Sequence, residues 1–168
     1  MDAKQHFNIE AYFKNLCETN KLAQEQGFHF CRCSGIESMQ EPLQQFRNKS
    51  AFFCIDDTTD GAIFRGRAGG HYTKRVFTVF LLRRYRFDDM DDRQQQLSIC
   101  RELFQQLMSK MIVDEDDLKN DLVYLHSENV MSRELGQYFM SGCTGLYFMI
   151  EVSEPIDLIF DDSQWQIS

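Results

Sequence analysis

One long strand-forming run constrains the fold more than any other part of the chain. Residues 72–87 have the sequence YTKRVFTVFLLRRYRF, in which alternate side chains point to opposite faces of a strand. Both faces are apolar in the middle of the run, since Phe77 and Leu81 share one face and Phe80 lies on the other. This pattern predicts a central strand that is covered on both sides. The charged ends of the run predict that the strand projects beyond the core.

A helical pattern follows this strand directly. Residues 91–111 carry an apolar stripe at three- and four-residue steps, formed by Leu97, Cys100, Phe104, Leu107, Met108 and Met111. The acids within 88–92 stand where carboxylates accept hydrogen bonds from free backbone amides and favour the helix dipole. We therefore expect an amphipathic helix that lies across the sheet. The acidic residues 114–121 are predicted to form a loop after it.

The other elements are shorter. Residues 7–26 predict a helix that ends at Gly27, and 36–49 predict a loop with one helical turn. Residues 62–65 are expected to return as a hairpin from the strand 51–56, after turn chemistry at 58–61. The further predicted strands are Phe28–Cys33, 122–125, 138–140 and 143–152, whereas 127–137 fits a strand or a loop.

Together these elements predict the fold class and its organisation. The 168 residues suffice for one domain, and the 43% hydrophobic and 13% aromatic content argues against a disordered chain. We predict a single α+β domain over 1–168, with a largely antiparallel sheet, an N-terminal helix and a second amphipathic helix packed on it. The apolar side chains of 156–168 predict a C-terminal tail that docks on a surface.

The net charge limits the classes of partner. A formal charge of -8 repels phosphate groups, so direct nucleic-acid binding is not expected. The N-terminus is polar, and no apolar run approaches the ~18 residues of a membrane span. We expect no membrane association and a cytoplasmic location when the chain is synthesised. The six cysteines are then expected to be reduced and partly buried.

The charge is distributed unevenly along the chain. Basic residues in and just before the long strand form a candidate subunit interface, namely Arg65, Arg67, Lys74, Arg83, Arg84 and Arg86. Acids gather at 88–92, 114–121 and 151–162. Basic and acidic zones on one chain allow head-to-tail pairing between copies. The alternative is a solvated charged surface without a partner.

No motif specifies catalysis, a cofactor or a metal. His29, Cys31 and Cys33 share a strand face and include soft zinc ligands, but a fourth ligand and the usual knuckle spacing are missing. The glycine-rich residues 66–70 precede a strand, so they do not fit a phosphate-binding loop. The acids at 88–92 fit helix capping better than a calcium site.

Candidate catalytic groups are equally isolated. His71, His126 and Cys143 have the chemistry of bases or a nucleophile, but no catalytic signature surrounds them. The sequence therefore assigns no catalytic, cofactor-binding or metal residue and no cofactor. A non-enzymatic role is the expectation, and an enzyme remains an alternative that would require a cleft joining these groups to the aspartates.

The order of elements resembles that of a known family. The long strand at Val76–Phe87, the helix at Asp91–Met111 and the closing strand at Gly142–Val152 (GCTGLYFMIEV) resemble tail-completion or tail-terminator proteins of tailed bacteriophages. Prophage-encoded proteins of Bacteroidetes type are also similar. The resemblance implies a structural protein that forms a ring, commonly six-fold, which caps the tail tube and joins other tail or connector proteins.

The resemblance also implies roles for particular segments. The loop 66–71 would face an interface or the lumen, and Arg83, Arg84 and Arg86 would meet acids of a neighbouring copy, so charge reversal at Arg84 would weaken assembly and leave the monomer folded. The chain would then end in a virion or tail-like particle. The alternative function is a small-ligand or regulatory module with a pocket between helix 91–111 and the sheet. Its predicted lining is Phe77, Phe80, Phe104 and Tyr147.

Overall fold

A mixed sheet forms the centre of the computed structural model, which describes residues 6–136 and 142–166. Within these residues the sheet has six strands, five of them in the order β1-β2-β4-β6-β5, with β3 paired to β4. The bounds are β1 Phe28–Cys33, β2 Ala51–Asp56, β3 Asp60–Arg65, β4 His71–Arg84, β5 Tyr124–Glu134 and β6 Cys143–Pro155. Only β1 and β2 run parallel; every other pair is antiparallel.

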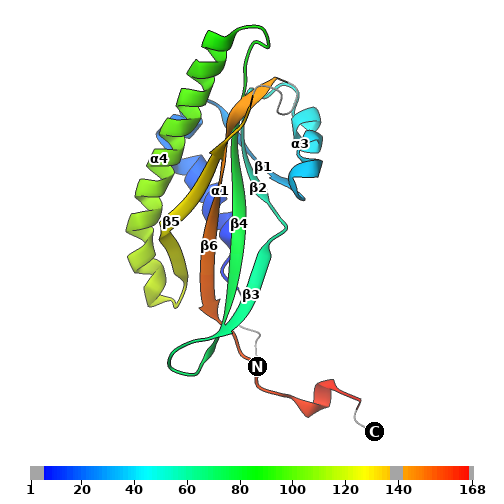
Figure 1. Cartoon of the computed structure of the whole chain (residues 1–168), viewed down its shortest axis with the longest axis vertical. Helices are drawn as coiled ribbons and strands as arrows, with labels where there is room; N and C mark the ends of the chain where they lie inside the picture. Colours follow the sequence, from blue (N-terminus) through cyan, green and yellow to red (C-terminus); the bar gives the residue numbers. More distant parts are fainter. Residues whose placement is uncertain (1–5, 137–141, 167–168) are drawn as a thin grey trace.

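Helices cover both faces of this sheet, but over different lengths (Figure 1). The helices are α1 Ile9–Thr19, α2 Lys21–Glu25, α3 Gln40–Gln45 and α4 Met90–Asn120, with short 3-10 turns at Ile36–Ser38 and Asp162–Gln164. α1 and α4 bury their apolar faces against one side of the sheet in the larger core. The smaller core lies on the other side, where Met39 and Leu43 cover β1, β2 and β4. The predicted α+β class is confirmed.

The central position predicted for the long strand is confirmed. β4 pairs with β6 from Tyr72 to Arg84 and with β2 over its C-terminal half. Phe77 and Leu81 enter the larger core and Phe80 enters the smaller one, as the alternation requires. Burial of such side chains stabilises the fold by about 1.5–3 kcal/mol each.

The hairpin predicted between 51–56 and 62–65 is wrong in its pairing. β3 pairs with β4 and lies beyond the end of β2 along the same edge of β4. The Asp56 carboxylate redirects the chain between the two strands, since it accepts hydrogen bonds from the amides of Gly35 and Thr58 (both 2.9 Å). The glycine-rich loop 66–70 therefore closes the β3–β4 hairpin.

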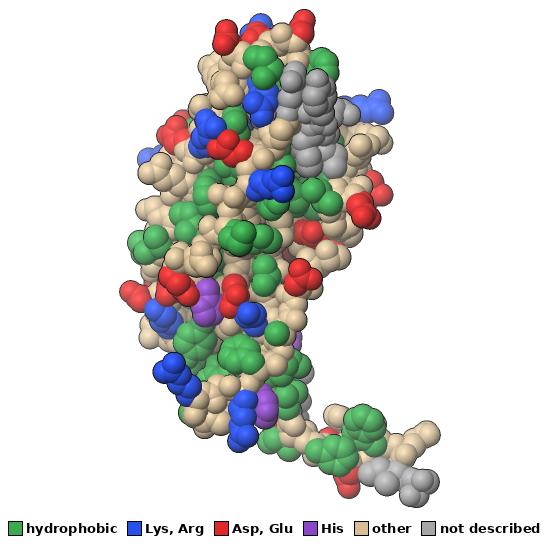
Figure 2. Space-filling model, viewed as in Figure 1, with side chains coloured by type: hydrophobic (Ala, Val, Ile, Leu, Met, Phe, Trp, Pro, Cys, Tyr) green, Lys and Arg blue, Asp and Glu red, His purple; other side chains and the backbone are tan. Residues whose placement is uncertain are grey.

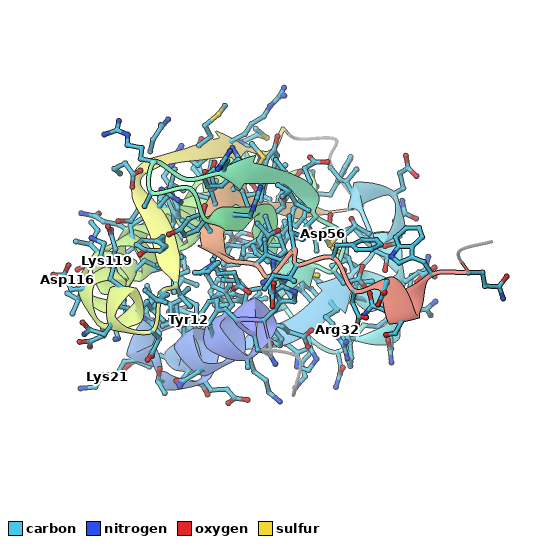
Figure 3. All side chains as sticks on the ribbon, turned by 90° about the horizontal axis from the view of Figure 1, so that it is seen from below. Tyr12, Lys21, Arg32, Asp56, Asp116 and Lys119 are labelled. Carbon is cyan, nitrogen blue, oxygen red and sulfur yellow. The ribbon has the colours of Figure 1, made fainter. Side chains whose placement is uncertain are left out.

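The acidic loop predicted at 114–121 is also wrong, because α4 continues to Asn120. Ion pairs between successive helical turns hold these residues in the helix: Lys110 pairs with Asp114, and Lys119 Nζ lies 2.9 Å from Glu115 Oε1. Lys119 also lies 3.6 Å from Asp116, on the same side of α4 (Figure 3). At the other end of α4 the capping prediction is confirmed, since the Asp89 side chain accepts from the Asp92 amide (2.9 Å).

Smaller differences have local causes. The helix predicted over 7–26 divides at Asn20, whose side chain accepts from the Ala23 amide (2.8 Å) and starts α2. Segment 36–49 contains more helix than the single turn predicted. The ambiguous segment 127–137 is strand as far as Glu134, with a bulge between His126 and Met131. The strand predicted at 138–140 lies outside the described residues.

Candidate functional site

The end of the sheet farthest from α3 carries the candidate site. This hairpin end consists of β3, the loop 66–70 and residues 71–76 of β4, and it extends beyond the helices (Figure 1). All six residues of β3 are exposed, including Ile63 at 58% and Phe64 at 42%. Edge strands with exposed apolar side chains favour association with another chain. The hairpin end is therefore a candidate interaction surface.

An aromatic row crosses one face of the hairpin end. Phe64 and Tyr72 are register partners, and their rings stack with centroids 5.6 Å apart and planes 18° from parallel. Tyr124 of β5 meets the Tyr72 ring edge to face, with centroids 6.2 Å apart. β6 lies between β4 and β5, and its residue Pro155 is the register partner of Tyr72. Phe64, Tyr72 and Tyr124, called the aromatic row below, are partly exposed.

Three of the predicted interface residues lie at the hairpin end, near this row. Arg65 and Arg67 are exposed beside the loop, and the Arg65 Nε donates to the Gly69 carbonyl (3.2 Å). Lys74 Nζ lies 3.5 Å from Glu151 Oε2 on the row's face. Lys and Arg side chains also gather at this end in the space-filling view (Figure 2). The hairpin end thus combines aromatic surface with local positive charge.

The other three predicted residues lie at the opposite end of β4, where groups of their own chain bind them. Arg83 is only 8% exposed, donates to the Gln26 carbonyl (2.9 Å) and Gln96 Oε1 (2.6 Å), and burial lowers its pKa. The C-terminal end of β4 therefore does not project, contrary to the prediction.

Arg84 and Arg86 also bind groups of their own chain. Arg84 donates to the Lys49 and Leu43 carbonyls (3.0 and 2.8 Å) and lies over the Phe52 ring. Arg86 lies 2.9 Å from the Asp89 carboxylate. The structure thus separates the six predicted residues into two groups, and only the group of Arg65, Arg67 and Lys74 borders the exposed aromatic surface.

Residues 156–166, the described part of the C-terminal tail, do not dock on the body, contrary to the prediction. Its first residue continues β6, since the Ile156 amide donates to the His71 carbonyl (3.0 Å). Ile159 is then 84% exposed, Phe160 67% and Trp165 64%. The last two rings stack with centroids 6.2 Å apart, and the tail stands clear of the body in Figure 2. The tail is thus a second uncovered apolar surface.

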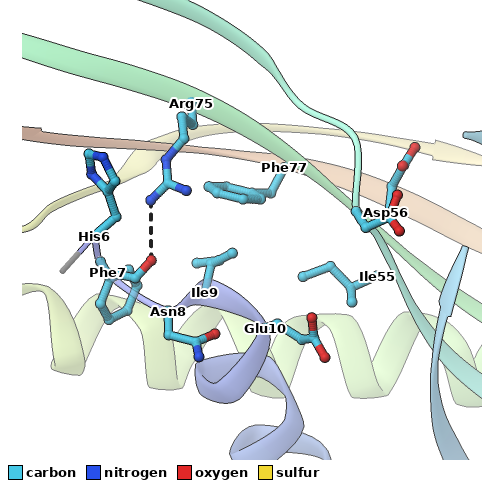
Figure 4. A pocket seen from close by; sticks show the side chains of 10 residues that line it. His6, Phe7, Asn8, Ile9, Glu10, Ile55, Asp56, Arg75 and Phe77 are labelled. Atoms are coloured by element: carbon cyan, nitrogen blue, oxygen red, sulfur yellow. Dashed lines mark hydrogen bonds between the residues drawn. The ribbon is translucent and has the colours of Figure 1, made fainter. Parts of the chain in front are cut away.

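A cleft of about 350 Å³ lies beside the start of α1 (Figure 4). Arg75 crosses it, donating from Nη2 to the Phe7 carbonyl (3.1 Å) and lying 3.6 Å from the Glu154 carboxylate. Its Nε atom is buried and has no hydrogen-bond partner. His6 Nδ1 lies 2.5 Å from Glu154 Oε1 at the same side. The cleft is therefore lined by the Arg75 guanidinium together with three carboxylates, those of Glu10, Asp56 and Asp57.

The four side chains predicted to line a ligand pocket between helix 91–111 and the sheet do not come together. Phe77 and Phe104 belong to the larger core, whereas Phe80 and Tyr147 lie on the opposite face with ring centroids 5.5 Å apart. One pocket cannot be lined from both faces of a sheet.

The candidate metal-binding and catalytic residues lie apart from one another or contact structural neighbours. Cys31 and Cys33 lie with Cys54 in the smaller core, and their hydrogen bonds, with burial, raise the Cys54 pKa and keep it neutral. His29 packs on Phe46 instead, and burial lowers its pKa. Over 6–136 and 142–166, no three or more His, Cys, Asp or Glu side chains are arranged to hold a metal ion. His126 contacts Ser153 Oγ (3.1 Å).

Comparison with known proteins does not assign the chain to a family. No protein-family model matches the chain, and a search of curated proteins finds no match. Among the helices of the described segments, none has both the length and the apolar character needed to cross a membrane.

Sequence reasoning missed the aromatic row, although one signal was available. Phe64 and Tyr72 stand symmetrically about the glycine-rich loop in FRGRAGGHY. Pairing 62–65 with the following strand instead of the preceding one would have placed the two rings side by side.

Proposed function

We propose that the chain is a non-enzymatic structural protein of a phage or phage-like tail, which assembles with copies of itself into a ring at the tail end. The observation that carries this proposal is the uncovered aromatic surface of the hairpin end. Large apolar side chains gathered on an exposed surface favour contact with another protein, because contact removes them from water. The flanking Arg65, Arg67 and Lys74 would set the orientation of that contact.

The order of elements supports the assignment to a tail. A long central strand followed by an amphipathic helix and a closing strand resembles tail-terminator proteins, and β4, α4 and β6 have this arrangement. The partners would then be further copies and other tail or connector proteins. After synthesis in the cytoplasm, the ring would become part of the tail-like particle. The net charge of -8 argues against binding to the DNA backbone.

Native mass spectrometry with light scattering, at low and moderate salt, tests the proposal. A closed ring, such as a hexamer, supports it, and negative-stain images should then show rings in end-on view. A chain that stays monomeric at high concentration and also fails to bind purified tail tubes contradicts it. Phe64→Ser with Tyr72→Ser serves as the interface variant, and Ile112→Ser with Val113→Ser is the matched control, since those two side chains are exposed on α4.

The cleft beside α1 favours a second candidate, a small-ligand binding module. Its specific support is the Arg75 guanidinium on the cleft wall, which could donate hydrogen bonds to an anionic ligand. A thermal-shift screen with small carboxylates and phosphates tests this candidate. A stabilising ligand whose effect disappears in Arg75→Met but persists in Lys21→Met supports it. No shift across the screen, or an equal shift in both variants, contradicts it.

A further inference from the structure

We infer that the C-terminal tail of one copy, residues 156–166, binds the aromatic row on the hairpin end of a second copy. This inference deepens the proposed function, because it names the two surfaces that would join neighbouring copies. It also stands apart from the phage assignment, since the contact depends only on side chains of this chain.

The tail has the composition of a binding segment. Phe160 and Trp165 already stack on one another, and the Asp161 side chain holds the turn between them by accepting from the Ser163 amide (3.0 Å). The pair is therefore ordered before it meets a partner, which lowers the entropy lost on binding. Ile159 adds apolar surface at the start of the pair, at 84% exposure.

The charge of the tail complements that of the hairpin end. Asp157, Asp161 and Asp162 are exposed on the tail. Arg65 and Arg67 are exposed at the hairpin end, and Lys74 lies there 3.5 Å from Glu151. Because the whole chain is acidic, a local basic surface is the favourable place for an acidic segment to bind.

The rings themselves also fit one another. Phe64 and Tyr72 offer a stacked pair at a sheet edge, and Tyr124 extends it toward β5. Aromatic rings prefer offset-stacked or edge-to-face contacts, which a second aromatic pair can make on a partly exposed row. Trp and Tyr are also enriched among the residues that dominate binding energy at protein interfaces. Aromatic contact would therefore supply most of the affinity.

The direction of the tail favours binding to another copy over its own. The Ile156 amide donates to the His71 carbonyl, so the tail leaves in the direction of β6, and in Figure 1 it runs away from the loop of its own hairpin. Reaching its own row would require a reversal directly after Pro155, and residues 156–166 contain no glycine to ease such a turn. The tail and the aromatic row are different surfaces, so each copy can bind one neighbour through its tail and another through its row. Such a head-to-tail contact closes into a ring when the rotation between successive copies adds up to a full turn.

The single tryptophan gives a direct assay. Trp165 is the only one in the chain, so its fluorescence reports the environment of the tail. We expect solvent-exposed emission at high dilution and a blue shift as the concentration rises and copies associate. The double variant Phe64→Ser/Tyr72→Ser should weaken self-association at least about tenfold and abolish the shift. Ile112→Ser/Val113→Ser should retain both.

A mixing experiment tests the pairing itself. The tail variant Phe160→Ser/Ile159→Ser retains an intact row, and the hairpin variant Phe64→Ser/Tyr72→Ser retains an intact tail. Each should be monomeric alone, whereas an equal mixture should give a 1:1 heterodimer in native mass spectrometry that does not grow. Arg65→Glu/Arg67→Glu should weaken binding, and Asp161→Lys/Asp162→Lys on the partner copy should restore it.

The outcomes separate this inference from the proposed function. Rings of wild-type size in both double variants would overturn the inference and leave self-assembly standing. Blue-shifted Trp165 emission that does not depend on concentration would show a tail bound to its own body and would also overturn it. Tail–row heterodimers without binding to tail tubes would support the inference and contradict the phage assignment.

Discussion

Gly145 lies so close to the neighbouring strand that a single methyl group there should disrupt the centre of the sheet. The residue pairs with Leu82 of β4 and has a φ of 146°, a backbone conformation that favours glycine. A Cβ atom at this position would lie 1.9 Å from the Leu81 carbonyl oxygen and 2.9 Å from its carbonyl carbon. Leu81 is fully buried, and both of these atoms belong to the backbone of a central strand, so they cannot rotate away as the end of a side chain could.

The structure allows the effect of Gly145→Ala to be bounded. Holding a non-glycine residue in a sparsely populated conformation costs about 1–3 kcal/mol. Moving β4 and β6 apart to admit the methyl group adds an overpacking penalty of about 1–3 kcal/mol. The expected loss is therefore about 2–6 kcal/mol, a large part of the roughly 5–15 kcal/mol by which small domains are stable.

Urea unfolding followed by circular dichroism measures this loss. Gly136→Ala is the matched control, because a Cβ there meets no atom of the described residues within 4 Å and Gly136 is not among the glycines with positive φ. The control should stay within about 0.5 kcal/mol of the wild type. If Gly145→Ala unfolded with the same midpoint and slope as the control, the close approach of β6 to β4 would be wrong.

Three further predictions concern the rest of the chain. Arg84→Glu should lower the free energy of unfolding by about 1.5–3 kcal/mol, because two backbone carbonyls lose a charged donor, whereas the exposed Arg133→Glu should have little effect in thermal denaturation. Burial and the Asp114 hydrogen bond raise the Tyr12 pKa above its ordinary 10.0, so the folded state holds the proton more tightly. That stability is complete below pH 10 and is lost as the pH rises further, so urea titrations should show a smaller alkaline loss in Tyr12→Phe. All six cysteines are buried and free, and burial raises the pKa of Cys17 and Cys100 to about 12, so Ellman's reagent should react slowly with the native protein and completely after denaturation.

The sequence predicts the centre of this fold because the signals there are local and agree with one another. The run at 72–87 alternates without interruption, and the stripe of 91–111 repeats over several turns, so tertiary contacts reinforce the local preference. The last turns of α4 escaped prediction because their support is not a stripe. Ile112 and Val113 are exposed, and ion pairs with Lys110 and Lys119 stabilise the helix there.

The candidate site was only half predictable, because proximity along the chain is not proximity in space on an extended strand. Lys74 and Arg83 are nine positions apart in β4, which corresponds to about 30 Å at a rise of about 3.3 Å per residue. The two residues also differ in exposure, since Arg83 is buried and bonds to groups of its own chain, whereas Lys74 lies at the surface. Whether a basic residue faces water depends on which elements cover the strand, and the pattern of a single strand does not contain that information.

The net charge also bears on how copies of this chain could associate. Two proteins of charge -8 repel one another at long range, so attraction must come from local surfaces. The basic flank of the aromatic row supplies such a surface for an acidic tail, but exposed ion pairs contribute only about 0–1 kcal/mol each. On the proposed tail contact, stable association would therefore depend on the apolar side chains of Phe160 and Trp165, and the charges would mainly select where on the neighbouring copy that contact forms.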